Sequence, residues 1–300
     1  PARSAHGPAS RGPVTSMATP RVVLVTRRTE YDELIARHGT RGQADFFLRS
    51  RGQSLDVLLA RHHALDAARH AVLAAIPVQW RRGQAERDEL ARFVFGPDDV
   101  VVAIGQDGLV ANVAKYLDGQ PVIGVNPMGG GGALVPHPCA AVADLLADIA
   151  GGRAAYLDRA MVEARTDDGQ QLRALNEIFV GHASHQSARY DLSVGATQES
   201  QSSSGVIAGT GTGASGWCAS IQRAVAPDLP LPAPADRSLA WFVREAWPSA
   251  STGTALAYGI LGRSEALCAT ARSEELVIFG DGIESDRLLL SWGQRVRISL

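Results

Sequence analysis

Lysine is almost absent from this sequence, because Lys115 is the single lysine and arginine supplies the rest of the 29 basic residues. Together with 31 acidic residues, this gives a formal net charge of -2. Proteins that bind nucleic acids or membrane surfaces usually carry a basic excess, so neither class of partner is expected. Any phosphate clamp built from side chains would have to use mostly arginine.

Cysteine is also scarce. Cys139, Cys218 and Cys268 are odd in number and far apart, and no CxxC pair occurs, so neither a zinc ribbon nor a disulfide framework is indicated. A reducing compartment, the cytoplasm, is the expected location. No apolar run reaches the roughly 18 to 20 residues that span a bilayer. Hydrophobic residues still make up 45% of the 300 residues, which is enough for a sizeable core in one or two domains.

Residues 1–16 are rich in Pro, Ser, Ala, Gly and Arg and contain no acid, which predicts a disordered extension or tag. An Arg- and Ser-rich, acid-poor start is also typical of a transit peptide. Over residues 17–138 apolar strands alternate with helical patterns, which predicts an α/β domain with a doubly wound parallel sheet. Its strands are expected at residues 21–26, 76–82, 100–104 and 121–126, and helices at 30–38, 53–73, 86–93 and 109–117.

The pattern changes in the second half of the chain. After a helix at residues 139–149 and Gly151-Gly152, the segments become short, alternating and rich in turns. Residues 139–300 therefore predict an antiparallel, sandwich-like, β-rich domain. We also consider an arrangement in which the C-terminal end of the chain packs back on the first domain.

The most informative short stretch is Gly105-Gln106-Asp107-Gly108, which follows a buried strand and precedes a helix. Ligands bind at the carboxyl ends of parallel strands, and glycines there let a backbone turn approach a phosphate closely. A carboxylate at this place could orient or deprotonate a hydroxyl group, or hold Mg²⁺. The structural alternative is that Asp107 simply caps the following helix.

Three further stretches are weak signals when taken singly. Asn176-Glu177 opens a strand and could bind a ribose or a base, although polar strand ends are common. Residues 206–217, VIAGTGTGASGW, form a Gly/Thr-rich loop that is neither a Walker loop nor a dinucleotide fingerprint. Asp281-Gly282 is typical of a β-turn. A hydrolase built from Ser184, His185 and Asp191 is disfavoured because no GxSxG elbow is present.

In this order the stretches resemble the NAD kinase family, within the superfamily that also holds diacylglycerol and sphingosine kinases. The closest likeness is to mitochondrial-type NAD kinases and their bacterial relatives, and it extends over residues 21–300. The motifs that carry it are GQDG at 105–108, PVIGVN at 121–126, Gly132-Ala133-Leu134, Asn176-Glu177, the 210–217 loop with Arg223-Ala224-Val225, Asp281-Gly282, TEYD at 29–32 and LLARH at 58–62.

The resemblance implies transfer of the ATP γ-phosphoryl group to the 2'-hydroxyl of the adenosine ribose of NAD, with Mg²⁺ or another divalent cation. It also implies an NAD-binding role for the β-rich domain and a homodimer. Asp107 would be the catalytic residue, and no metal ligand is firmly assigned. The residues expected to bind substrate or nucleotide are Gly105, Gln106, Gly108, Asn126, Asn176, Glu177, Thr210, Gly211, Thr212, Gly213, Trp217 and Asp281.

The chain departs from the family pattern mainly on the phosphate side. Gln106 replaces a glycine, Leu109 replaces a Thr or Ser, and Ala214-Ser215-Gly216 replaces a more polar triplet. If position 106 needed a positive φ, a non-glycine residue would cost about 1–2 kcal/mol, and its side chain would also occupy space near the donor phosphates. We therefore consider two alternatives: a catalytically impaired NAD(P)-binding homologue with a regulatory role, and a kinase of another hydroxyl acceptor.

Overall fold

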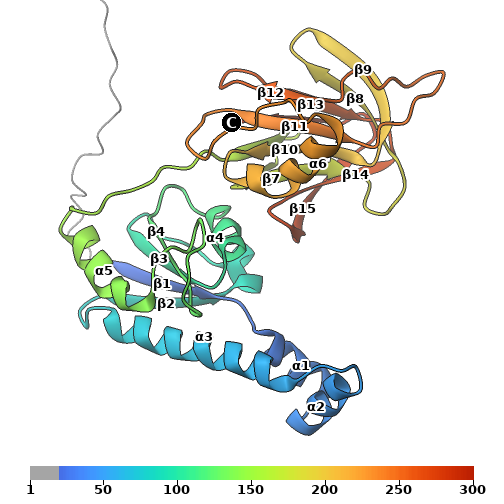
Figure 1. Ribbon diagram of the computed structural model, residues 1–300. Coiled ribbons are helices and arrows are strands. Elements are labelled where there is room, and N and C mark those ends of the chain that lie inside the picture. Colours follow the sequence, from blue (N-terminus) through green and yellow to red (C-terminus); the bar gives the residue numbers. More distant parts are fainter. Residues whose placement is uncertain (1–19) are drawn as a thin grey trace, which may run out of the picture. The chain divides into compact units, whose positions relative to one another are not determined.

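A computed structural model describes residues 20–300 of the chain (Figure 1). The extension predicted at residues 1–16 lies outside the described residues. The boundary between domains was predicted after residue 138, whereas the first compact unit continues to Tyr156. Within the described residues, the first unit comprises 20–86, 94–105 and 118–156, and the second comprises 87–93, 106–117 and 157–300.

The first unit is built on a four-stranded sheet with the strand order β2-β1-β3-β4. All three pairings are parallel, which confirms the predicted α/β class with a parallel sheet. The central strand β3 is buried along its whole length, as its run of Val residues predicts. The strands are β1 (Arg21–Thr26), β2 (Arg81–Glu86), β3 (Asp99–Ile104) and β4 (Val122–Val125).

Helices α3 and α5 cover one face of this sheet (Figure 1). Val72 of α3 and Leu146 of α5 pack in one core with Leu24 and Val102 of the strands. Because alternate residues of a strand point to one face, these contacts define the face of the sheet that the two helices cover. The helices of this unit are α1 (Glu30–His38), α2 (Arg41–Arg49), α3 (Leu55–Ala75) and α5 (Val142–Ala150), with the 3-10 turn η2 (Cys139–Ala141) before α5.

The second unit contains two six-stranded sheets with antiparallel pairings, which confirms the predicted β-rich second part. Side chains of both sheets, such as Ile178, Tyr190 and Leu290, share one core. The first sheet has the order β12-β11-β10-β7-β14-β15, and the second β6-β5-β16-β13-β8-β9. The strands are β5 (Val162–Thr166), β6 (Gln171–Ala174), β7 (Glu177–Gly181), β8 (Ala188–Val194), β9 (Thr197–Ser203), β10 (Gly205–Thr210), β11 (Leu239–Arg244), β12 (Tyr258–Leu261), β13 (Leu267–Ala271), β14 (Glu275–Gly280), β15 (Ile283–Ser291) and β16 (Arg295–Ser299).

Four helical segments among the described residues accompany these sheets. Helix α6 (Trp217–Val225) packs on the face of the first sheet that carries Ile207 and Phe242. The 3-10 turn η3 (Gly213–Ser215) leads into it. Helix α4 (Asp107–Ala114) and the 3-10 helix η1 (Arg87–Arg92) also belong to the second unit, although both connect strands of the first. The helix that begins within the GQDG stretch is thus part of the β-rich unit.

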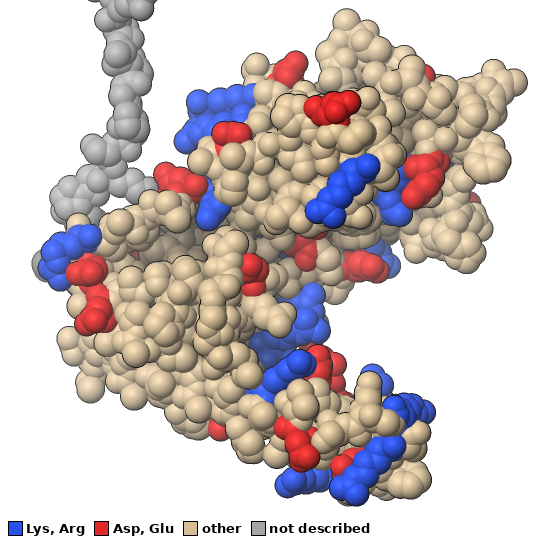
Figure 2. All heavy atoms as spheres, in the orientation of Figure 1, with Lys and Arg blue, Asp and Glu red and all other residues tan. Residues whose placement is uncertain are grey.

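On the face drawn in Figure 2, acidic and basic side chains are interspersed, in line with the near-neutral sequence. Within residues 20–300, no helix has both the length and the apolar character that crossing a membrane would need.

Candidate functional site

The GQDG stretch is divided between a strand end and a helix start. The N–H of Gly105 donates to the carbonyl oxygen of Val125 at 2.9 Å, which ties the end of β3 to β4. Gln106 then occupies the N-cap position of α4 with φ −106° and ψ 168°. This backbone is extended, so the replacement of glycine by Gln106 introduces no backbone strain.

Asp107 is the first residue of α4 and is half-buried, between the exposed residues Gln106 and Gly108. The cap position belongs to Gln106, whose side chain makes no capping hydrogen bond. The structural alternative, in which Asp107 is itself the cap, is therefore not what the helix shows. A carboxylate in the first helical turn also interacts favourably with the positive end of the helix dipole.

The Asn176-Glu177 pair is held in place by Asp281. The Asp281 carboxylate accepts hydrogen bonds from the backbone N–H groups of Leu175, Asn176 and Glu177 at 2.8, 2.7 and 3.3 Å. In return the Asp281 N–H donates to the Glu177 carbonyl oxygen at 3.1 Å. The sequence marked Asp281 as a nucleotide contact, but its carboxylate is engaged by the protein backbone.

Burial dominates the protonation of both carboxyl groups. It raises the pKa of Glu177 to about 7, and the nearby Asp281 charge raises it further. It also raises the pKa of Asp281 to about 6, against the lowering effect of the three backbone N–H donors and of Lys115. Among the described residues, no hydrogen bond to the Glu177 carboxyl group contributes to this shift.

The Gly/Thr-rich loop packs directly on Asn176. The Thr210 hydroxyl donates to the Leu175 carbonyl oxygen at 2.6 Å, and it accepts from the N–H groups of Thr212 and Gly213. The Thr210 hydroxyl is thus used inside the protein. By contrast, the Thr212 hydroxyl is buried and has no hydrogen-bond partner among the described residues.

The glycines of this loop allow close backbone contacts. A Cβ atom on Gly213 would lie 2.4 Å from the carbonyl oxygen of Asn176, and one on Gly211 would lie 1.8 Å from that of Ala233. Only glycine fits where two backbones approach in this way. The TGTG spacing therefore places the loop against the Asn176-Glu177 pair.

Trp217 packs against protein side chains. Its ring stacks on Phe179, with centroids 5.7 Å apart and an interplanar angle of 15°. The Arg244 guanidinium lies 5.1 Å from the Trp217 ring centroid, a favourable cation–π contact. We predicted Trp217 in a nucleotide crevice, with core packing as the alternative, and these contacts agree with packing.

The motif residues of the first unit organise its own loops. The Asn126 side chain donates to the Gly130 carbonyl oxygen at 2.9 Å and accepts from the Met128 N–H at 3.0 Å, so it holds the Gly-rich loop. A Cβ atom on Gly124 would lie 1.8 Å from the Leu134 carbonyl oxygen. The PVIGVN motif thus needs its glycine and asparagine to fold the segment that follows.

The TEYD and LLARH motifs meet each other. Thr29 caps α1 in a capping box with Asp32, and its hydroxyl lies 3.1 Å from Nδ1 of His62. The rings of Tyr31 and His62 are 4.9 Å apart. Burial raises the pKa of Asp32, but the hydrogen bonds from Thr29 and the His62 side chain outweigh it, so the pKa is lowered. The two motifs therefore stabilise a helix packing contact.

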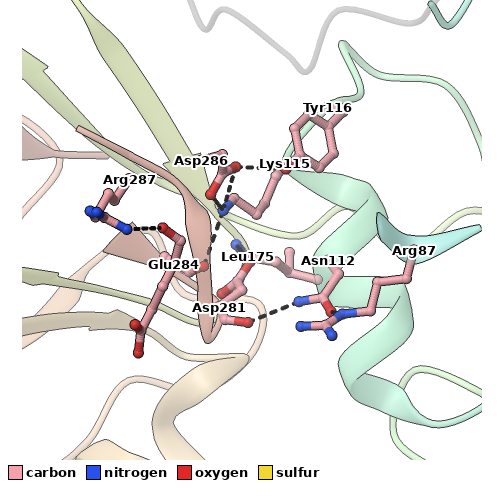
Figure 3. A network of polar contacts seen from close by, with 10 residues as sticks. Arg87, Asn112, Lys115, Tyr116, Leu175, Asp281, Glu284, Asp286 and Arg287 are labelled. Atoms are coloured by element: carbon pink, nitrogen blue, oxygen red, sulfur yellow. Dashed lines mark hydrogen bonds and ion pairs between the residues drawn. The ribbon is translucent and has the colours of Figure 1, made fainter. Parts of the chain in front are cut away.

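Sequence reasoning missed the residues that hold α4 in the second unit (Figure 3). The Asn112 amide donates to the Asp281 carbonyl oxygen at 2.8 Å and accepts from Nε of Arg87 at 2.7 Å. The Lys115 ammonium donates to the Gly280 carbonyl oxygen at 3.1 Å and pairs with Asp286 at 2.9 Å. An Asn within an apolar helix, and the single lysine directly after that helix, were the available signals.

No group of three or more His, Cys, Asp or Glu side chains in the described part of the chain could hold a metal ion. Mg²⁺ is often bound through one or two carboxylates and the substrate phosphates.

Comparisons with known proteins agree with the motifs. No protein-family model matches this chain. The chain is 28% identical over 260 residues to NAD kinase 2, mitochondrial, of Homo sapiens, which covers 67% of this chain and 57% of that protein. It is 28% identical over 263 residues to the Rattus norvegicus protein of the same name, covering 68% and 60%. The chain thus matches less than two thirds of the length of these relatives, and the similarity supports the likeness to NAD kinases.

Proposed function

We propose that this chain is an NAD kinase-like phosphotransferase, which moves a phosphoryl group from ATP, or another donor, to the 2'-hydroxyl of NAD. The similarity to NAD kinase 2, mitochondrial, of Homo sapiens and Rattus norvegicus and the order of the motifs support this assignment. In the reaction, the ribose oxygen forms a bond to the γ-phosphorus, and the bond from that phosphorus to the β-γ bridging oxygen breaks. ADP leaves, and the hydroxyl proton goes to a base.

The observation that carries the proposal is a pair of polar side chains around one strand start. The buried Thr212 hydroxyl has no partner in the described chain. The Glu177 carboxyl lies in the adjoining segment, largely buried. Buried polar groups are normally hydrogen-bonded. The hydroxyl groups of a ribose would bind both.

Asp107 is our candidate for the base that positions or deprotonates the acceptor hydroxyl. Base assistance of this kind is worth roughly 10²- to 10⁴-fold in rate. The N-terminal N–H groups of α4, which receive no side-chain cap from Gln106, suit an anionic phosphate. A divalent cation, when bound, would neutralise charge on the donor phosphates, and Asp107 or Glu177 would face it.

The test is NADP formation by the full chain with Mg²⁺, NAD and, in turn, ATP, other nucleoside triphosphates and polyphosphate. We expect the parent to form NADP and Asp107→Asn to lose at least about a hundredfold in kcat. The matched control is Asp88→Asn, which alters an exposed carboxylate of the same unit and should retain activity. No NADP from the parent with any donor would contradict the proposal.

The second candidate is a catalytically impaired NAD(P)-binding homologue. Gln106 and Leu109 favour it, because both change the side where donor phosphates would bind. Because the backbone at Gln106 is extended, backbone strain does not explain a loss of activity. The remaining explanation is the bulk of the Gln106 side chain beside the donor phosphates. A thermal shift with NAD or NADP, without product, would indicate this function. Recovery of activity in Gln106→Gly would place the defect in the donor loop.

A further inference from the structure

Asp281 is unusually buried for a residue in a tight turn. It lies with Gly282 between β14 and β15, and both residues have positive φ, 53° and 68°. Asp-Gly suits such a hairpin turn. However, the turn alone does not explain why Asp281 is only 9% exposed. A buried carboxylate requires several hydrogen-bond partners.

The Asp281 side chain binds one element and its main chain binds another. Its carboxylate accepts from three successive N–H groups at residues 175–177. Its carbonyl oxygen accepts from the Asn112 amide of α4, and Arg87 fixes the orientation of that amide through Oδ1 (Figure 3). One residue therefore links the Asn176-Glu177 segment to the helix that begins at Asp107.

The neighbouring contacts make this link rigid. Lys115, whose side chain is 2% exposed, donates to the carbonyl oxygen of Gly280, the residue before Asp281. It also pairs with Asp286 of β15, which accepts from the Tyr116 hydroxyl at 2.6 Å. The C-terminal half of α4 and the residues that follow it are thus fastened to the β14–β15 hairpin.

We propose that Asp281 is a positioning residue, which fixes the Asp107 helix relative to the acceptor-binding segment through Asn112. The inference rests on the proposed function, because it assigns the reacting carboxylate to Asp107 and the acceptor to Asn176-Glu177. The two halves of the link have separate effects. The Asn112 contact governs the placement of the base, and the Asp281 carboxylate governs the acceptor segment.

The test compares Asn112→Ala, Asp281→Asn and the matched control Val113→Ala in the full chain. Val113 is fully buried in the same helix and only packs, so its variant should lose stability without losing positioning. We expect Asn112→Ala to lower kcat by about tenfold or more, since small misplacements are costly in rate. Its KM for NAD should stay within about twofold of the parent value. Asp281→Asn, which still tolerates a positive φ, should raise the KM for NAD by about tenfold.

Amide hydrogen exchange provides a readout that does not need activity. Asn112→Ala should speed exchange over residues 107–114 and leave residues 175–181 protected, and Asp281→Asn should speed exchange over 175–181. If both variants follow Val113→Ala in kinetics and in exchange, the inference is overturned. If the parent forms no NADP, the proposed function fails, and the exchange pattern alone decides the inference.

Discussion

The Cα atom of Gly213 faces the backbone of Asn176 so closely that a Cβ atom would lie 2.4 Å from the Asn176 carbonyl oxygen and 2.7 Å from its Cα atom. A Cβ atom essentially never lies within 3.0 Å of a non-bonded atom, and a backbone cannot swing away as a side chain can. The loop and the strand start therefore form one packed element, and each depends on the other for its conformation.

This contact predicts that Gly213→Ala will destabilise the chain and displace the Asn176-Glu177 pair. We expect a loss of about 3 kcal/mol in the free energy of unfolding, because inserting a methyl group into a tight backbone contact forces a shift. Denaturant unfolding measures the loss. The control is Gly42→Ala, where nothing lies within 4 Å of the new Cβ and φ is not positive. Equal stability of the two variants would contradict the prediction.

Glu177→Gln should change how stability depends on pH. Glu177 has a pKa of about 7 in the folded chain, against about 4.3 when unfolded. Between these values the folded state binds more protons, so its contribution to stability is largest at low pH and is lost as pH rises. The variant should match the parent near pH 4 and exceed its stability by up to about 3 kcal/mol near pH 8. Chemical unfolding at both pH values tests this, and a difference independent of pH would refute it.

Two helix caps of the first unit should differ in strength. Thr29 belongs to a capping box and also contacts His62, whereas Thr40 caps α2 through the Gln43 N–H alone. Thr29→Ala should cost about 1–2 kcal/mol, and Thr40→Ala at most about 1 kcal/mol. Thermal unfolding of the two variants compares them directly. A larger loss at Thr40 would show that the contact with His62 adds nothing.

Trp217→Leu separates packing from nucleotide stacking. Because the indole faces Phe179 and Arg244, we expect a lower Tm and an unchanged affinity for NAD. Isothermal titration with NAD, at a temperature where both proteins are folded, measures the affinity. A large loss of affinity at unchanged Tm would instead indicate that Trp217 contacts the nucleotide. Phe279→Leu, which alters another ring beside Phe179, is the matched control.

Hydrophobic patterning was sufficient to predict much of the fold. The buried Val runs of β1 and β3 and the capped helix α1 were predicted at or within one residue of their bounds. The strand expected at residues 76–82 is wrong, because Ile76 ends α3, and β2 begins only at Arg81 after a turn. Helix α2 was not predicted, and neither was β9. The polar strand β9 lies at a sheet edge, where no apolar face is required.

For the candidate site, too, the sequence predicted some features and missed others. The order of the motifs singled out Asn176, Gly213 and Asp281 as nucleotide-binding residues, and the structure shows close backbone contacts at these positions. The spacing did not reveal what Asp281 does, since its partners at residues 112 and 175–177 lie more than 100 positions away. Nor did it reveal the role of Lys115, whose partner Asp286 is 171 residues distant. Such pairings depend on sheet topology, which composition and periodicity do not specify.

The burial of the single lysine has a practical consequence for chemical labelling. Reagents that acylate amines react with exposed, unprotonated amino groups, and Lys115 combines 2% side-chain exposure with an ion pair. In the native protein its ammonium group is shielded from such reagents. The rate of acylation at residue 115, followed by mass spectrometry, would therefore report how often the α4 region opens to solvent.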